Sequence, residues 1–124
     1  MDTNINKTAA VDFLEMVIAG KIDEAYEKYV DMSGKHHNLH TPTGLEAFRE
    51  GMKSADSQFP DATFVVQHVL GEGDLVAVHS HLTLNEKMDF AAVHLIRFEN
   101  GKIVEFWDIA QDIPAESPNT DGPF

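Results

Sequence analysis

The sequence predicts an α+β domain in which three N-terminal helices pack on one face of a curved, mostly antiparallel sheet. Two observations carry this prediction. Apolar residues recur at helical spacing in the first half of the chain, and consecutive runs rich in β-branched residues fill most of the second half. Helices followed by strands are typical of α+β folds. Because no repeat or linker interrupts the chain, we expect one domain over residues 1–124, with residues 114–124 as a C-terminal arm.

The composition limits the classes of partner and chemistry. The chain carries 9 basic and 21 acidic residues, a net charge of −12, which argues against nucleic acid and anionic membranes because both require a basic surface. It has no cysteine, so disulfides, thiolate catalysis and thiolate metal ligands are excluded. No apolar run approaches the ~20 residues of a membrane span, and the start lacks a signal-peptide pattern. We therefore expect a soluble cytoplasmic protein.

The predicted helices have apolar stripes and recognisable ends. The first spans residues 8–19 and the second residues 23–30. Thr43 and Glu46 fit a capping box for the third helix, which should end near Ser57. The inner stripe of the first helix consists of Ala10, Val11, Leu14, Val17 and Ile18.

The second half of the chain predicts strands. A polar segment at residues 31–40, with three histidines and an asparagine, suggests a turn followed by a short extended piece. Residues 63–70 and 75–84 form two strands, and residues 88–109 form a hairpin around Glu99-Asn100-Gly101. Both hairpin strands are apolar on both faces. One face should therefore line a pocket under the helices and the other should pack against a partner.

The partner face predicts a homodimer through the sheet. Val93, Leu95, Trp107 and Ile109 would lie on the face away from the helices. An exposed apolar patch of this kind usually marks an interface.

The turn of the hairpin decides whether His94 and Asp108 can cooperate. A two-residue Asn100-Gly101 turn would put His94 opposite Trp107 and leave Asp108 on the other face. A three-residue loop would place His94 and Asp108 on one face, and we favour it because it requires glycine at its third position. The pairs would then be Phe98 with Lys102, His94 with Phe106, and Ala92 with Asp108.

Asp108 and His94 are the candidate catalytic residues. A carboxyl group on an apolar, helix-covered face loses solvation, which raises its pKa and suits a general acid or base. A nearby imidazole can hydrogen-bond the carboxyl and oppose that shift. The structural alternatives are that Asp108 ends its strand near solvent and that His94 is a hydrogen-bonded core histidine. On the same face, Phe90, Ala92, Ile96 and Phe106 would contact a small apolar ligand that carries a few oxygen atoms.

The seven histidines invite a metal site. His79 and His81 share a strand face, and His94 could approach them, but the turn after residue 84 leaves their face undecided. Zinc would need three such ligands. We favour solvent-facing or hydrogen-bonded histidines, with no metal and no cofactor.

Nearly the whole chain resembles the SnoaL-like polyketide cyclase family of the NTF2-like superfamily. The resemblance is carried by GDLVAVHSHLTL, by HLIRFENGKIVEFWDIAQ and by the earlier YVDMSGKHHNLHTPTGLEAF. It implies a cone-shaped fold, a pocket between sheet and helices, a dimer through the sheet, and an intramolecular aldol condensation that needs no metal or cofactor. The family's acid–base Asp would fall on Asp108 and its neighbouring His on His94.

The resemblance also implies that His37 and Asn38 line the pocket as polar groups. One departure stands beside the aspartate, since Phe106 occupies a position where relatives often have histidine. We expect a cofactor-free cyclase, isomerase or lyase in which Asp108 removes a proton next to a carbonyl and His94 assists. The alternative is a dimer that binds a small apolar ligand without catalysis.

Overall fold

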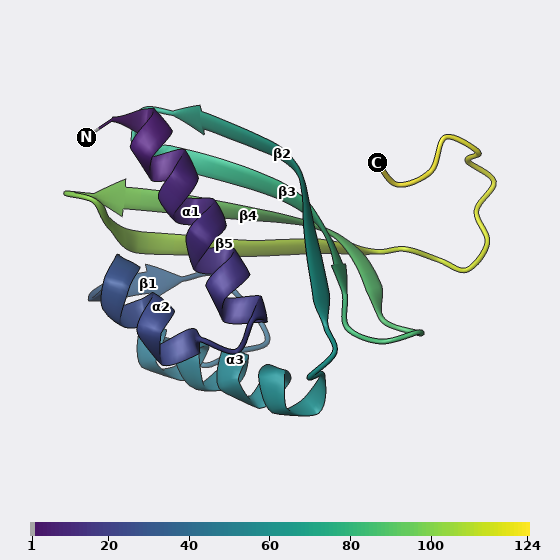
Figure 1. The fold of residues 1–124 in the computed structure, drawn as a ribbon, viewed down its shortest axis with the longest axis horizontal. Helices are drawn as coiled ribbons and strands as arrows, with labels where there is room; N and C mark the ends of the chain where they lie inside the picture. Colours follow the sequence, from purple (N-terminus) through teal and green to yellow (C-terminus); the bar gives the residue numbers. More distant parts are fainter. Residues whose placement is uncertain (1) are drawn as a thin grey trace.

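Three helices lie on one face of a five-stranded sheet in the computed structural model, which describes residues 2–124 (Figure 1). The helices are α1 (Thr3–Ile18), α2 (Ile22–Tyr29) and α3 (Leu45–Gln58). The strands are β1 (Val30–His36), β2 (Thr63–Glu72), β3 (Leu75–Thr83), β4 (Asp89–Glu99) and β5 (Lys102–Asp112). The sheet order is β1-β5-β4-β3-β2; β1 is parallel to β5, and the other neighbours are antiparallel. The predicted α+β class is confirmed.

Two helix starts differ from the prediction. Helix α1 begins five residues earlier than expected, at Thr3 instead of residue 8, because the Asp2 carboxylate caps it by accepting the backbone N–H of Asn4 at 2.7 Å. Helix α3 has no capping box. Its N-cap is Gly44, which provides no side chain, and Glu46 instead forms an ion pair with Arg49 at 2.6 Å.

The core between helices and sheet centres on four aromatic rings. Phe13 of α1 contacts Tyr26 of α2 edge-on at 5.5 Å and Phe106 of β5 at 5.9 Å, measured between ring centroids. Phe48 of α3 contacts the same Phe106 at 5.1 Å. All four residues are at most 4% exposed, so this cluster fixes the three helices on β5.

The hairpin of β4 and β5 closes with a two-residue turn, so the predicted three-residue loop is wrong. Asn100 and Gly101 both have positive φ, 52° and 80°, and Glu99 pairs with Lys102. A β-bulge follows at once: Phe98 pairs with Ile103 and Arg97 with Glu105, which leaves Val104 as an extra residue.

The bulge changes the register of the rest of the hairpin by one residue. His94 now lies directly opposite Asp108, whereas the two-residue turn alone would have set it opposite Trp107. The two side chains therefore share a face, as predicted, although for a different reason. The predicted pairs are wrong: Ala92 lies opposite Ala110 instead of Asp108, and Phe98 opposite Ile103 instead of Lys102. Phe106, predicted opposite His94, lies opposite Ile96.

Strand β1 is built to fit this bulge. Its pairing with β5 is interrupted between Val30 and Lys35, and Gly34 lies in the interruption, directly against Val104. A Cβ atom on Gly34 would stand 2.3 Å from the Val104 carbonyl oxygen. A side chain is thus excluded where the two irregular strands meet.

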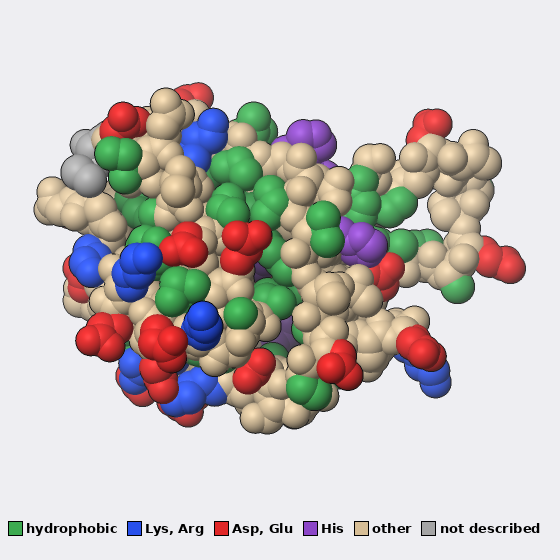
Figure 2. Space-filling model, viewed as in Figure 1, with side chains coloured by type: hydrophobic (Ala, Val, Ile, Leu, Met, Phe, Trp, Pro, Cys, Tyr) green, Lys and Arg blue, Asp and Glu red, His purple; other side chains and the backbone are tan. Residues whose placement is uncertain are grey.

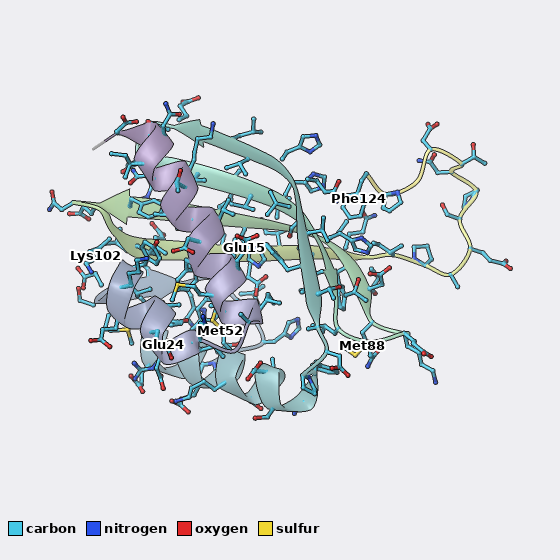
Figure 3. The ribbon with its side chains drawn as sticks, in the orientation of Figure 1. Glu15, Glu24, Met52, Met88, Lys102 and Phe124 are labelled. Atoms are coloured by element: carbon cyan, nitrogen blue, oxygen red, sulfur yellow. The ribbon has the colours of Figure 1, made fainter. Side chains whose placement is uncertain are left out.

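The outer face of the sheet carries the residues predicted for a dimer. Val93 pairs with Ile109, and Leu95 pairs with Trp107. Ile109 is 52% exposed to solvent. The C-terminal segment leaves β5 and loops back to the sheet, where the Phe124 ring lies 5.4 Å from that of His79 and 4.9 Å from that of His81 (Figure 3).

None of the helices in the described part of the chain is long and apolar enough to cross a membrane.

Candidate functional site

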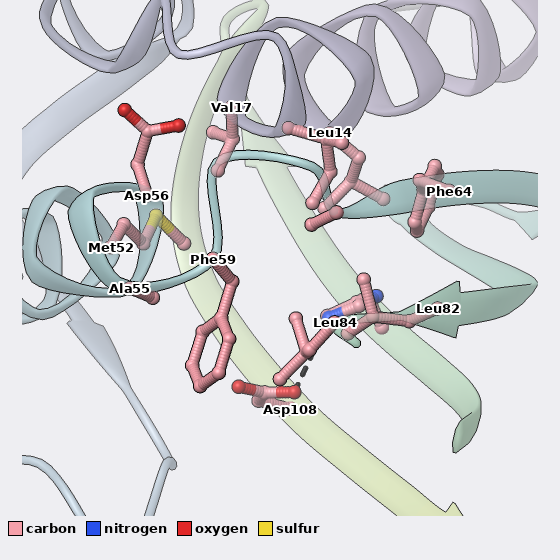
Figure 4. A pocket seen from close by; sticks show the side chains of 13 residues that line it. Leu14, Val17, Met52, Ala55, Asp56, Phe59, Phe64, Leu82, Leu84 and Asp108 are labelled. Carbon is pink, nitrogen blue, oxygen red and sulfur yellow. Dashed lines mark ion pairs between the residues drawn. The ribbon is translucent and has the colours of Figure 1, made fainter. Parts of the chain in front are cut away.

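A cavity of about 210 Å³ lies between α1, α3 and the inner face of the sheet. In the space-filling view the surface is hollowed beside α1, and apolar side chains surround the opening (Figure 2). The apolar lining residues are Leu14, Val17, Ile18, Met52, Ala55, Phe59, Ala62, Phe64, Leu82 and Leu84. Only Asp56, His94 and Asp108 bring ionisable groups to the wall (Figure 4). A small polar site in an apolar cavity is the usual form of a ligand pocket.

The two predicted catalytic residues meet on this wall. His94 Nε2 lies 3.2 Å from Asp108 Oδ1, and the second oxygen, Oδ2, accepts a hydrogen bond of 2.9 Å from Asn38 Nδ2. The Asp108 side chain is 29% exposed and that of His94 is 11% exposed. The carboxylate is therefore held at both oxygens yet stays accessible from the cavity.

His94 directs its ring nitrogen Nε2 at Asp108. Its other ring nitrogen, Nδ1, is buried and has no hydrogen-bond partner among residues 2–124. The ring is packed between Phe64 at 6.3 Å and Phe106 at 5.6 Å, measured between centroids. This arrangement fixes the ring and directs Nε2 at the carboxylate.

The pKa of Asp108 lies below its ordinary value, which corrects the predicted rise. Burial alone raises this pKa, as expected from the sequence. The hydrogen bond and charge of His94, the hydrogen bond from Asn38 and the charge of His36 together outweigh burial. Asp108 is consequently ionised at neutral pH.

The two adjacent histidines at the end of β1, His36 and His37, lie on opposite faces of the sheet. His37 stacks on Trp107 at 4.9 Å and contacts Glu105 through Nε2 at 2.7 Å, both on the outer face. The predicted pocket-lining position of His37 is therefore wrong. His36 takes the inner side instead, where its ring stacks on Phe48 at 4.5 Å. Asn38 is at the site, through its hydrogen bond to Asp108.

The other residues predicted to contact the ligand lie around the pair without lining the cavity. Ala92, Ile96 and Phe106 are at most 2% exposed and form the packed layer beside His94. Phe90 is half-buried and pairs with Leu82 of the cavity wall. Ligand contact by these four residues stays a prediction.

Helices α1 and α3 supply six of the thirteen lining residues. Leu14 and Val17 belong to the predicted inner stripe of the first helix, but periodicity does not distinguish a side chain that fills a core from one that faces a cavity. Phe59 and Ala62 follow α3 in the connection to β2, where no periodic pattern marks them. The local signal there is Pro60, which indicates the end of a helix.

The remaining histidines do not join the pair. His79 lies opposite Val93, on the outer face, and its Nδ1 is 3.0 Å from that of His68. His81 contacts Asp89 at 2.6 Å on the same outer face. Among residues 2–124, no group of three histidine or acidic side chains is arranged to hold a metal ion.

Comparison with known proteins identifies the family of the chain and structures with a similar fold. The sequence matches the family described as SnoaL-like polyketide cyclase over residues 8–117, whereas no curated protein matches the chain. An NTF2-like protein of unknown function from Cytophaga hutchinsonii has a similar structure, with a TM-score of 0.71 and 17% identity over 86% of this chain and 89% of that chain.

Two further structures carry enzyme names. A putative ketosteroid isomerase from Kribbella flavida has a TM-score of 0.73 and 18% identity, covering 95% of this chain and 86% of that chain. A putative polyketide cyclase from Acidithiobacillus ferrooxidans has a TM-score of 0.69 and 20% identity, covering 86% of this chain and 88% of that chain. These likenesses establish the NTF2-like fold, and the family match over most of the chain shows that it belongs to the SnoaL-like polyketide cyclase family.

Proposed function

We propose that the protein is an acid–base enzyme that removes a proton next to a carbonyl group of a small, largely apolar substrate. The observation that carries the proposal is the ionised Asp108, held by His94 and Asn38 on the wall of an otherwise apolar cavity. The family, named for polyketide cyclases, and the isomerase and cyclase names of two structural neighbours support an enzyme of this general type. The reaction would be an aldol cyclisation, an isomerisation or a cleavage.

The geometry supports a division of roles. Asp108 takes the proton from the carbon, because it is ionised and accessible from the cavity. His94 orients the carboxylate, since its Nε2 is directed at Asp108 and its Nδ1 is buried. A ligand that fills the cavity also removes water from Asp108, and this desolvation raises the pKa of the carboxyl and strengthens it as a base.

The size of the cavity points to a small substrate. Pockets for drug-sized ligands hold roughly 300–1,000 Å³, and this cavity of about 210 Å³ is smaller. The substrate should therefore be closer to one ring than to a fused polyketide skeleton.

The test is exchange of α-protons for deuterium, followed by NMR on a panel of small cyclic ketones and 1,3-diketones. We expect the wild type to accelerate exchange for at least one compound and Asp108→Asn to lose about 100-fold or more of that rate. Asp56→Asn is the matched control, because Asp56 lines the same cavity without a histidine partner. Unchanged exchange in Asp108→Asn would refute the role of Asp108.

A second candidate is ligand binding without catalysis. It is favoured by one observation: both oxygens of Asp108 are already engaged and its pKa is low, which weakens it as a base. Saturable chemical-shift changes on adding a panel compound, with no exchange of its α-protons, would support this alternative.

We also propose a homodimer through the outer face of the sheet. The apolar side chains of Val93, Leu95, Trp107 and Ile109 form one patch there, and Ile109 is largely open to solvent.

A further inference from the structure

We infer that His36 is a positioning residue for the site: it folds the segment after β1 so that the Asn38 amide reaches Asp108. The catalytic consequence rests on the proposed function, whereas the structural part concerns Asp108 alone. The residue predicted from the sequence is the neighbouring His37, and nothing in the spacing of the histidines distinguishes the two.

Both ring nitrogens of His36 hold the segment that follows it. Nδ1 lies 3.1 Å from the backbone nitrogen of Asn38 and must accept the hydrogen bond that its N–H donates. Nε2 lies 2.7 Å from the carbonyl oxygen of Pro42 and must donate to it. The ring thus bridges the start and the end of a tight turn, in the tautomer that carries its hydrogen on Nε2.

The ring itself is anchored from the other side. It stacks on Phe48 with 12° between the planes, and Phe48, which is 4% exposed, packs on Phe106. His36 also pairs with Phe106 in the sheet. The turn is therefore tied to the aromatic core and to β5, the strand that carries Asp108.

The turn leaves the Asn38 side chain a single orientation. Asn38 Oδ1 accepts the backbone N–H of His40 at 2.9 Å, and Asn38 Nδ2 donates to Asp108 Oδ2 at 2.9 Å. With its backbone N–H held by His36, Asn38 is fixed at the main chain and at both atoms of its amide. The contacts run without a break from Pro42 through His36 and Asn38 to the carboxylate.

A matched pair of substitutions separates this role from general packing. His36→Phe keeps a ring to stack on Phe48 and removes both hydrogen bonds. His37→Phe keeps a ring to stack on Trp107 and removes the contact with Glu105 on the opposite face. The readout is the NMR signal of the Asn38 side-chain amide, which shifts when its hydrogen bond to Asp108 is lost, recorded at neutral pH without substrate.

We expect the Asn38 amide signal to move toward the position of a solvent-exposed amide in His36→Phe and to keep its wild-type position in His37→Phe. The carboxyl-carbon signal of Asp108 at neutral pH should shift in both His36→Phe and Asn38→Ala, and the double variant His36→Phe/Asn38→Ala should add little, because His36 acts through Asn38. An unchanged Asn38 signal in folded His36→Phe, or fully additive carboxyl shifts in the double variant, would overturn the inference.

Wild-type protein provides a test that does not depend on the variants folding. Ring ¹⁵N shifts should show His36 with its hydrogen on Nε2 and both nitrogens hydrogen-bonded; the other tautomer would overturn the inference. The proton-exchange assay of Asp108→Asn tests the function separately. An Asn38 amide signal that responds to His36→Phe in a protein without turnover would retain the positioning role and reject the enzyme.

Discussion

Replacing Gly34 by alanine tests whether the contact between β1 and the bulge of β5 sets the register of the site. The new methyl group would stand 2.3 Å from the Val104 carbonyl oxygen and 2.9 Å from its Cα, so backbone and not a movable side chain must give way. The φ angle of Gly34 is not positive, and alanine therefore brings no backbone strain of its own.

The expected cost follows from two opposing effects. Overpacking of a well-packed site costs about 1–3 kcal/mol, and the upper end applies because the obstacle is main chain. A lower entropy of the unfolded chain returns about 0.4–1 kcal/mol. We expect a net loss of about 2 kcal/mol in the free energy of unfolding, measured by urea denaturation, and a rise in the pKa of Asp108 as β5 shifts relative to His94.

Gly51→Ala is the matched control for this experiment. Gly51 lies within α3, and its added Cβ would meet nothing closer than the Thr41 side chain at 3.8 Å. Alanine in a helix should stabilise the protein by about 0.5–1 kcal/mol. If Gly34→Ala proved as stable as Gly51→Ala and left the titration of Asp108 unchanged, the proposed fit between β1 and the bulge would be refuted.

Three further predictions concern other parts of the molecule. The folded-state pKa of Asp108 lies below its ordinary value of 3.8, so the ionised carboxylate stabilises the fold above that pH, and this stability is lost as the pH falls through the folded-state pKa. The urea midpoint should therefore drop more between pH 6 and pH 3 in the wild type than in Asp108→Asn. Equal drops would contradict the link between the ionisation of Asp108 and stability. Gly101→Ala should cost about 1–2 kcal/mol in thermal or urea unfolding, because φ at this turn position is 80°; a neutral effect would mean that the turn changes type. Light scattering should give twice the chain mass for the wild type and the chain mass for Ile109→Glu, since a charge would enter the proposed apolar interface; a monomeric wild type would reject the dimer.

The fold could be predicted from the sequence because its signals are local. Helical stripes, an Asn-Gly turn signal and runs of β-branched residues each act within a few positions, and their order gives the α+β class. The site depended on longer-range geometry. Both turns considered for Asn100-Gly101 assumed a regular hairpin, whereas the extra residue Val104 restores the shared face of His94 and Asp108 after the shorter turn.

The two histidines at the end of β1 show the same limit. The choice between His36 and His37 depends on which face each residue takes, and alternation along β1 from the buried Val30 puts His36 on the inner face. The sequence predicts only a short extended piece within residues 31–40, so it offers no starting residue from which to count this alternation. Likewise the pKa of Asp108 could not be predicted from burial alone, because the lowering contribution of Asn38 depends on where that turn places its amide.

The bulge at Val104 also makes the alignment of His94 with Asp108 less dependent on the turn at the tip of the hairpin. Because β1 holds Val104 from the side, the alignment of β5 below the bulge is set by a neighbouring strand as well as by the turn. If a longer loop replaced Asn100-Gly101, the strands should therefore change only between the turn and the bulge. This end of the hairpin is accordingly the natural place to insert a peptide tag or a spectroscopic label while the carboxylate and imidazole remain opposite each other.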